Sequence, residues 1–157
     1  MLGLMRIRSL SHSVYQLQYH IVWGTKYRIK YIIPAVKNEL IHCLYEIVKK
    51  YPTLHIFTIN TNRDHVHIQL EAPPSVALSS VVPKLKATSS FYLRKRFKFI
   101  REAYLEIEGI WSVGYFVSSV GLNESQVRRY IEWQGKKEVP QTIRTIQASK
   151  QKGFEFE

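Results

Sequence analysis

Two histidines separated by one residue are the first feature of the sequence that could support chemistry. His65 and His67 flank Val66, and side chains two residues apart on a β-strand point to the same face. Two imidazoles on one face can bind a single divalent metal ion. The same pattern also arises where two surface histidines flank a core valine, so the motif alone leaves both interpretations open.

A tyrosine and a glutamine nearer the C-terminus form a second candidate pair. Tyr130 and Gln134 are four residues apart, so on a helix they project from one face. A tyrosine hydroxyl can attack phosphorus when a cation polarises the target, and an amide oxygen suits a hard ion such as Mg²⁺ or Mn²⁺. Tyr130 is also one of ten tyrosines, and packing on a helical core stripe is the structural alternative.

The hydrophobic pattern predicts the elements that position these residues. After a loose lead-in over residues 1–12, alternation predicts strands over residues 14–23, 54–60, 65–71 and 110–118. Helical spacing predicts one helix from Pro34, a second from about Ser79 with Pro83 in its first turn, and a third after Asn123. His20 shares a strand face with polar residues, where it could line the same surface as the histidine pair or be an ordinary surface histidine.

This order, β-α-β-β-α-β-α, predicts an α+β fold. Its first six elements match the ferredoxin-like or RRM-like arrangement, an antiparallel sheet with helices on one face, and the last helix would carry Tyr130. The length of 157 residues fits one domain over residues 1–157. We expect its core to span about residues 14–137, with residues 138–157 as a C-terminal tail.

The composition limits the class of binding partner and the cellular compartment. The net charge of +11 indicates an anionic partner, and nucleic acid is favoured over a membrane because no strongly amphipathic basic helix stands alone. No apolar run is long enough to span a bilayer. A single cysteine, Cys43, excludes an intramolecular disulfide framework. A cytoplasmic protein with a nucleic-acid partner and without a membrane partner is therefore expected.

Basic residues gather in one segment. Residues 72–101 hold seven basic side chains and no acidic one, and Phe91, Tyr92 and Phe97 lie among them. Basic and aromatic side chains together are typical of surfaces that bind single strands, although a solvated helix face with its aromatics in the core gives the same pattern. The candidate DNA contacts are Lys26, Arg28, Lys84, Lys86, Arg94, Lys95, Arg96, Arg128 and Arg129.

Taken together, the two motifs resemble those of a known family. His65-Val66-His67 after Asp64 looks like the His-hydrophobic-His motif of HUH endonucleases, and Tyr130-Ile131-x-x-Gln134 looks like the single-tyrosine motif of insertion-sequence transposases of the TnpA type. Further matches lie at residues 19–23 and 111–116, so the resemblance runs over nearly the whole chain.

The resemblance implies a mechanism and an assembly. Tyr130 would attack a DNA phosphate and leave a 5′-phosphotyrosine link and a free 3′-OH, while His65, His67 and Gln134 would hold one divalent ion, Mg²⁺ or Mn²⁺. Strand joining would need no nucleotide cofactor. Members of this family are homodimers that act on single-stranded DNA with hairpins at the element ends, and Gly121 would be a hinge before the tyrosine helix.

Several alternatives remain open. Within the same chemistry, the chain could be a domesticated relative that cleaves palindromes or a rolling-circle type nickase. A non-catalytic RNA- or DNA-binding module with the RRM-like sheet is a different class, and a DNA-bridging protein would follow if the site were inactive. A base-stacking module would carry aromatics on its open face, where the third predicted strand instead carries His65, His67, Gln69 and Glu71.

Overall fold

A four-stranded antiparallel sheet forms the centre of the protein, as the α+β prediction requires. The computed structural model describes residues 8–10, 13–15, 17–105, 109–119, 129–134 and 136. Its elements in chain order are β1 (Arg8–Leu10), β2 (Ser13–Tyr15), β3 (Gln18–Gly24), η1 (Lys26–Arg28), α1 (Pro34–Val48), β4 (His55–Thr61), β5 (His65–Glu71), α2 (Leu78–Arg96), α3 (Lys98–Ala103) and β6 (Phe116–Ser118).

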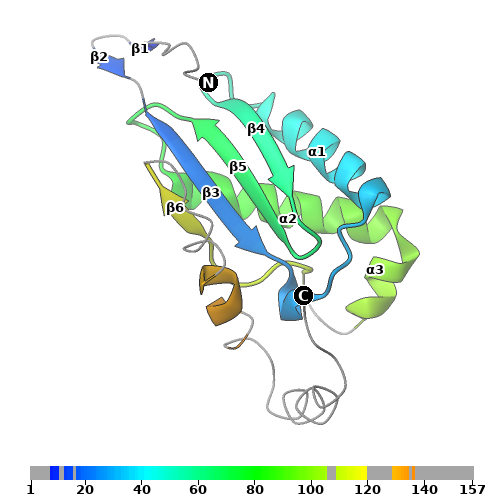
Figure 1. Cartoon of the computed structure of the whole chain (residues 1–157). Helices are drawn as coiled ribbons and strands as arrows, with labels where there is room; N and C mark the ends of the chain where they lie inside the picture. The colour runs from blue at the N-terminus through cyan, green and yellow to red at the C-terminus, as the bar shows by residue number, and fades with distance from the viewer. Residues whose placement is uncertain are drawn as a thin grey trace.

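The strand order of this sheet is β4-β5-β3-β6, and every neighbouring pair is antiparallel. This order, with α1 between β3 and β4 and α2 between β5 and β6, is that of the ferredoxin-like fold. Helices α1 and α2 lie side by side behind the sheet (Figure 1). The opposite face is therefore left for other contacts.

The core lies between the sheet and these two helices. On β5 the side chains of Val66, Ile68 and Leu70 are fully buried, so the alternation read from the sequence gives the correct inner face. Helix α1 begins at Pro34, where the missing N–H has no helical partner to lose. Its apolar stripe, which includes Leu40 and Leu44, is buried against the same core.

The N-terminal strand differs from its prediction. The predicted strand over residues 14–23 is two strands, because β2 pairs with β1 in a separate two-stranded sheet while β3 pairs with β5 and β6. The lead-in over residues 1–12 also contains β1. The alternation of side chains in the sequence continues through β2 and β3, and it does not indicate with which strand each of them pairs.

The fourth predicted strand is much shorter than expected, since only Phe116–Ser118 forms β6. Gly114 has φ +84°, a left-handed conformation that interrupts extended backbone. A β-bridge between Thr25 and Trp111 lies outside the named strands. As a result Val113 is 72% exposed while Trp111 is 6% exposed, although a regular strand over residues 110–118 would place both side chains on one face.

The predicted position of Pro83 in the first turn of the second helix is wrong. Because α2 begins at Leu78 and continues to Arg96, Pro83 lies in its second turn and removes the N–H that would bond to the carbonyl of Ser79. A short helix that the sequence did not predict, α3, follows α2 directly. The predicted start of the third helix at Asn123 and the hinge Gly121 lie outside the described residues, whereas residues 129–134 are helical.

Candidate active site

The histidine pair lies on the open face of the sheet. Val66 is fully buried on the helix side, so His65 and His67 point to the face opposite α1 and α2. In the register of β3 and β5, His65 pairs with Gly24 and His67 with Val22. The predicted arrangement of two imidazoles on one strand face is therefore present.

The side chain of His65 is oriented by a carboxylate. Its Nδ1 lies 2.8 Å from Oδ1 of Asp64, and its Nε2 lies 3.2 Å from the side-chain nitrogen of Asn62. An amide nitrogen donates, so Nε2 accepts and the ring proton stands on Nδ1, where it donates to Asp64. This tautomer presents the Nε2 lone pair, which is the form that a metal ligand needs.

Asp64 is fixed from a second direction. Its Oδ2 lies 3.3 Å from the guanidinium of Arg28, a residue for which the sequence analysis predicted a DNA contact. Burial raises the pKa of the Asp64 carboxyl, but the hydrogen bonds and charges of His65 and Arg28 outweigh it and hold this pKa below its ordinary value. The sequence pattern predicts no role for Asp64, and its position directly before the histidine motif is the signal that points to it.

A third histidine adjoins the pair. Nδ1 of His20 lies 3.4 Å from Nε2 of His67, and the two ring centroids are 5.7 Å apart. Burial, and then the nearby charges of His20 and His65, lower the pKa of His67. His67 is thus held toward its neutral form. His20 lines the same surface as the histidine pair, which is one of the two interpretations that its strand pattern allowed.

The helix that carries Tyr130 packs on this same face. Ile131 is 3% exposed and forms a small apolar cluster with Val22, against which Phe116 and Tyr130 pack. A Cβ placed on Gly24 would lie 3.1 Å from Cδ1 of Ile131, so the glycine permits this close approach. Val22 and Gly24 are the β3 partners of His67 and His65, which brings the helix beside the histidine pair.

Tyr130 and Gln134 meet at Gly114. A Cβ on Gly114 would lie 3.9 Å from both the Tyr130 hydroxyl oxygen and the Gln134 side-chain nitrogen. That nitrogen donates a hydrogen bond to the carbonyl of Val113, and the Tyr130 hydroxyl is buried. The predicted sharing of one helix face by Tyr130 and Gln134 is therefore present, and the glutamine keeps its oxygen as the atom that would bind a cation.

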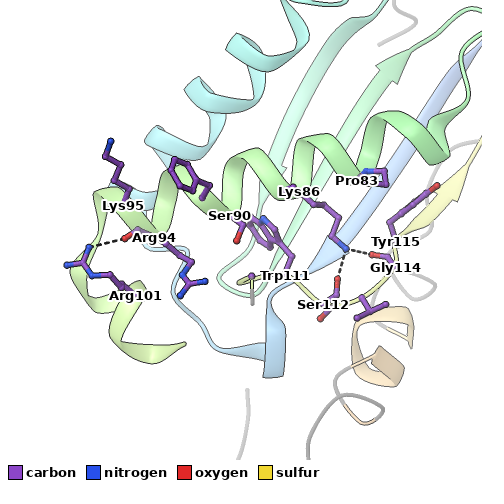
Figure 2. Close-up of a pocket in the computed structure, with 14 residues that line it drawn as sticks. Pro83, Lys86, Ser90, Arg94, Lys95, Arg101, Trp111, Ser112, Gly114 and Tyr115 are labelled. Atoms are coloured by element: carbon purple, nitrogen blue, oxygen red, sulfur yellow. Dashed lines mark hydrogen bonds between the residues drawn. The ribbon is translucent and has the colours of Figure 1, made fainter. Parts of the chain in front are cut away.

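Lys86 holds the segment on which the tyrosine helix rests. Its ammonium donates to the carbonyls of Ser112, at 2.5 Å, and Gly114, at 2.7 Å (Figure 2). Val113, between these two residues, accepts the hydrogen bond of Gln134. The density of basic residues predicted that Lys86 contacts DNA. That density cannot show whether a lysine lies in solvent or, like Lys86, donates to backbone carbonyls.

The other predicted DNA contacts are dispersed. Lys84 lies 5.6 Å above the ring of Tyr51, the guanidinium of Arg96 lies 3.7 Å from Glu39, and that of Arg94 lies 3.5 Å from the carbonyl of Tyr104. Lys95 and Arg129 are exposed, Lys26 lies in η1, and Arg128 is outside the described residues. Their contacts with DNA stay predictions.

The donor set fits a divalent ion in its chemistry. His65 carries its ring proton on Nδ1, so its Nε2, which accepts from Asn62, could exchange that hydrogen bond for a metal ion. His67 is held toward its neutral form, and Gln134 carries an amide oxygen on the helix that packs on this face. Within the part of the chain that the structure describes, no three His, Cys, Asp or Glu side chains are placed to hold a metal together. A site here would therefore depend on the glutamine as its third protein ligand.

Comparisons with known proteins define the class. The family model of IS200-like transposases matches residues 13–134. The transposase of insertion sequence element IS200 from Salmonella typhimurium is 31% identical over 127 residues, which are 81% of this chain and 82% of that protein. The ISDra2 transposase TnpA of Deinococcus radiodurans is 32% identical over 126 residues, 80% and 89% of the two chains.

Two solved structures share the fold of this chain. The crystal structure of a candidate transposase from Deinococcus radiodurans superposes with a TM-score of 0.74 at 27% identity, over 81% of this chain and 97% of that one. A REP-associated tyrosine transposase bound to a REP hairpin shares the fold, with a TM-score of 0.51 at 11% identity over 79% and 67% of the two chains.

The chain therefore belongs to the family of IS200-like transposases, as the paired motifs in the sequence implied. None of the helices within the described residues is long and apolar enough to cross a membrane.

Proposed function

We propose that this protein is a metal-dependent transposase that cuts and rejoins single-stranded DNA through a covalent bond to Tyr130. The observation that carries this proposal is that the Tyr130 helix and the histidine pair share the open face of the sheet, with Ile131 packed against Gly24, the β3 partner of His65. A nucleophile and two metal-ligating side chains are thus gathered on one surface.

The protein's residues divide the chemistry among them. The phenolic oxygen of Tyr130 attacks the scissile phosphorus and loses its proton, the bond from phosphorus to the 3′ oxygen breaks, and that oxygen takes up a proton. A divalent ion held by His65, His67 and Gln134 would polarise the phosphate and stabilise the charge that develops on it. Asp64 keeps His65 in its ligand tautomer.

Rejoining is the reverse exchange on a new strand. A 3′-hydroxyl attacks the phosphotyrosine, and the Tyr130 oxygen leaves. One phosphodiester is exchanged for another through an ester of similar kind, so no nucleotide cofactor is required. Because the Tyr130 hydroxyl is buried beside Gly114, we expect the helix to shift before attack.

The DNA partner proposed here is a single strand that carries hairpins at the element ends. The net charge of +11 supports an anionic partner, and a protein of the same fold is bound to a REP hairpin. The working form is proposed to be a homodimer, as the resemblance to single-tyrosine transposases implies.

Loss of either histidine tests the proposal. His65→Ala and His67→Ala should lower the rate of Mn²⁺-dependent cleavage of a labelled, hairpin-bearing single strand by about a hundredfold or more, while metal-free binding of the hairpin is unchanged. His42→Ala on the exposed side of α1 is the matched control and should cleave like the wild type. Cleavage that survives in both site variants would refute the metal role, and equal loss of cleavage and hairpin binding would indicate a folding role.

A further inference from the structure

Two consecutive residues beside the candidate active site adopt the left-handed backbone conformation. Tyr27 has φ 58° and Arg28 has φ 55°, and among the described residues no other residue with a side chain has a positive φ. This conformation is unfavourable for bulky side chains because the Cβ comes close to a backbone carbonyl. A strained pair of this kind persists only where surrounding contacts hold it.

Hydrogen bonds from distant parts of the chain hold this turn. The N–H of Arg28 donates to the carbonyl of Thr25 at 3.1 Å, and the N–H of Lys26 donates to the carbonyl of Ile110 at 2.9 Å. The side chain of Tyr104 is fully buried, and its hydroxyl donates to the carbonyl of Lys26 at 2.7 Å. The strained conformation is therefore maintained by the fold and not by local preference.

The chain on both sides of the strained pair also binds the turn that precedes His65. The N–H of Thr25 donates to the carbonyl of Asp64 at 2.8 Å, and the N–H of Ile32 donates to the carbonyl of Arg63 at 3.1 Å. These bonds fix the backbone between β4 and β5, but they do not fix the torsion angles of the Asp64 side chain. The carboxylate needs a contact of its own.

The side chain of Arg28 supplies this contact. Its Nε and Nη2 lie 3.4 and 3.3 Å from Oδ2 of Asp64, while Oδ1 lies 2.8 Å from Nδ1 of His65. The two carboxylate oxygens thus have different partners, and the arginine limits rotation of the group. Because φ sets the direction in which a side chain leaves the turn, the left-handed conformation and the contact with Asp64 belong together.

We infer that Arg28 is a positioning residue of the proposed metal site, and that the strained turn is retained because it aims this guanidinium at Asp64. The guanidinium holds the carboxylate where it accepts the Nδ1 proton of His65, so that Nε2 of His65 stays the ligand nitrogen. Removal of a side chain that orients a metal ligand typically lowers metal affinity by about 10- to 100-fold. This inference rests on the proposed function, and it gives Arg28 a role other than the predicted DNA contact.

Glycine at position 28 separates positioning from stability. Arg28→Gly removes the guanidinium and also relieves the left-handed strain, whereas Arg28→Ala removes the guanidinium and keeps the strain. We expect Arg28→Gly to unfold at a higher temperature than Arg28→Ala. Both variants should nevertheless bind Mn²⁺ about tenfold more weakly than the wild type, as measured without DNA by electron paramagnetic resonance of the unbound ion.

A spectroscopic measurement tests whether the effect passes through His65. In protein labelled with ¹⁵N-histidine, long-range ¹H–¹⁵N correlation spectra distinguish a ring protonated on Nδ1 from one protonated on Nε2. We predict the Nδ1 form for His65 in the wild type and a mixture of both forms in Arg28→Gly, with unchanged metal-free affinity for the hairpin. Arg96→Ala removes an arginine of α2 that lies 3.7 Å from Glu39, and as the control it should change neither Mn²⁺ affinity nor the His65 tautomer.

The outcomes separate the inference from the proposed function. If the wild type binds Mn²⁺ and Arg28→Gly binds it equally well, the inference is wrong, and a loss confined to Arg28→Ala would show that affinity follows stability instead. If the hairpin affinity of Arg28→Gly falls while its Mn²⁺ affinity does not, Arg28 is the DNA contact that the sequence predicted. If the wild type binds no Mn²⁺, the metal role in the proposed function fails and the inference fails with it.

Discussion

Asp64 shows how one side chain can prepare another for chemistry. It accepts from His65 on one oxygen and contacts Arg28 through the other, so it is held on two sides and fixes the tautomer of the histidine. This orientation by a carboxylate that is not itself a ligand is a common device for metal-binding histidines. Asp64 is therefore a positioning residue of the proposed site.

The pKa of Asp64 predicts an acid-sensitive contribution to stability. Because this pKa is lower in the folded protein than in the unfolded chain, the contribution is present above the unfolded value of about 3.9 and is lost as the pH falls through the folded value. Asp64→Asn should lower the free energy of unfolding at pH 7 by about 1–3 kcal/mol. Its difference from the wild type should shrink below about pH 4, as measured by urea unfolding.

Glu102→Gln provides the control for this experiment. Glu102 is an exposed carboxylate on α3, 3.4 Å from Lys98, and exposed ion pairs contribute little to stability. This variant should follow the wild type across the pH range. Parallel curves for the wild type and Asp64→Asn would show that Asp64 does not titrate as described.

At the scale of elements, the position of the tyrosine helix depends on what lies beneath it. The helix contacts β3 through Ile131 over Gly24 and contacts residues 112–114 through the Gln134 hydrogen bond. The first contact is a close steric fit. In the second, Lys86 fixes residues 112–114 by donating to the carbonyls of Ser112 and Gly114. Each contact can be changed separately.

Gly24→Ala tests the steric contact. The new Cβ would lie 3.1 Å from Cδ1 of Ile131, closer than ordinary van der Waals contact, so Ile131 must give way by a few tenths of an ångström and its helix is pressed away from β3. We expect the rate of strand cleavage to fall about tenfold with little change in thermal stability. Adding Ile131→Val removes only that Cδ1 and should restore much of the rate. Failure of the double variant to recover would contradict the packing of this helix on β3.

Lys86→Met tests the support under residues 112–114. Without the ammonium, the carbonyls of Ser112 and Gly114 lose their donor, and we expect cleavage to slow about tenfold or more while metal-free hairpin affinity stays close to that of the wild type. Lys50→Met, at an exposed lysine just after α1 that is not among the candidate DNA contacts, is the control. If hairpin affinity falls and the cleavage rate of bound DNA does not, Lys86 is instead the DNA contact that the sequence suggested.

Elements with a regular pattern could be predicted from the sequence, and those set by single contacts could not. The bounds of β5 and the start of α1 at Pro34 match their predictions, because alternation and proline act locally. The late start of the fourth predicted strand depends on the φ of Gly114 and on a lysine 26 residues away from Ser112. Neither leaves a periodic signal in the chain.

At the scale of the whole molecule, the two faces of the sheet have different roles. One face is sealed by α1 and α2, and the other carries the histidine pair and the tyrosine helix (Figure 1). The sequence predicted the fold class and the shared face of His65 and His67, because both follow from element order and strand period. It could not predict the contact between Arg28 and Asp64, since only the fold joins these separate segments.

The central claim is that Tyr130 forms a covalent bond to cleaved single-stranded DNA. The most direct measurement is to incubate the wild type with Mn²⁺ and a hairpin-bearing single strand, isolate the protein–DNA adduct under denaturing conditions, and locate the modified residue by peptide mass spectrometry. We predict a nucleotide attached to Tyr130, no adduct with Tyr130→Phe, and a normal adduct with Tyr45→Phe as the control. An adduct that forms equally well on Tyr130→Phe, or one that maps to another residue, would contradict this account.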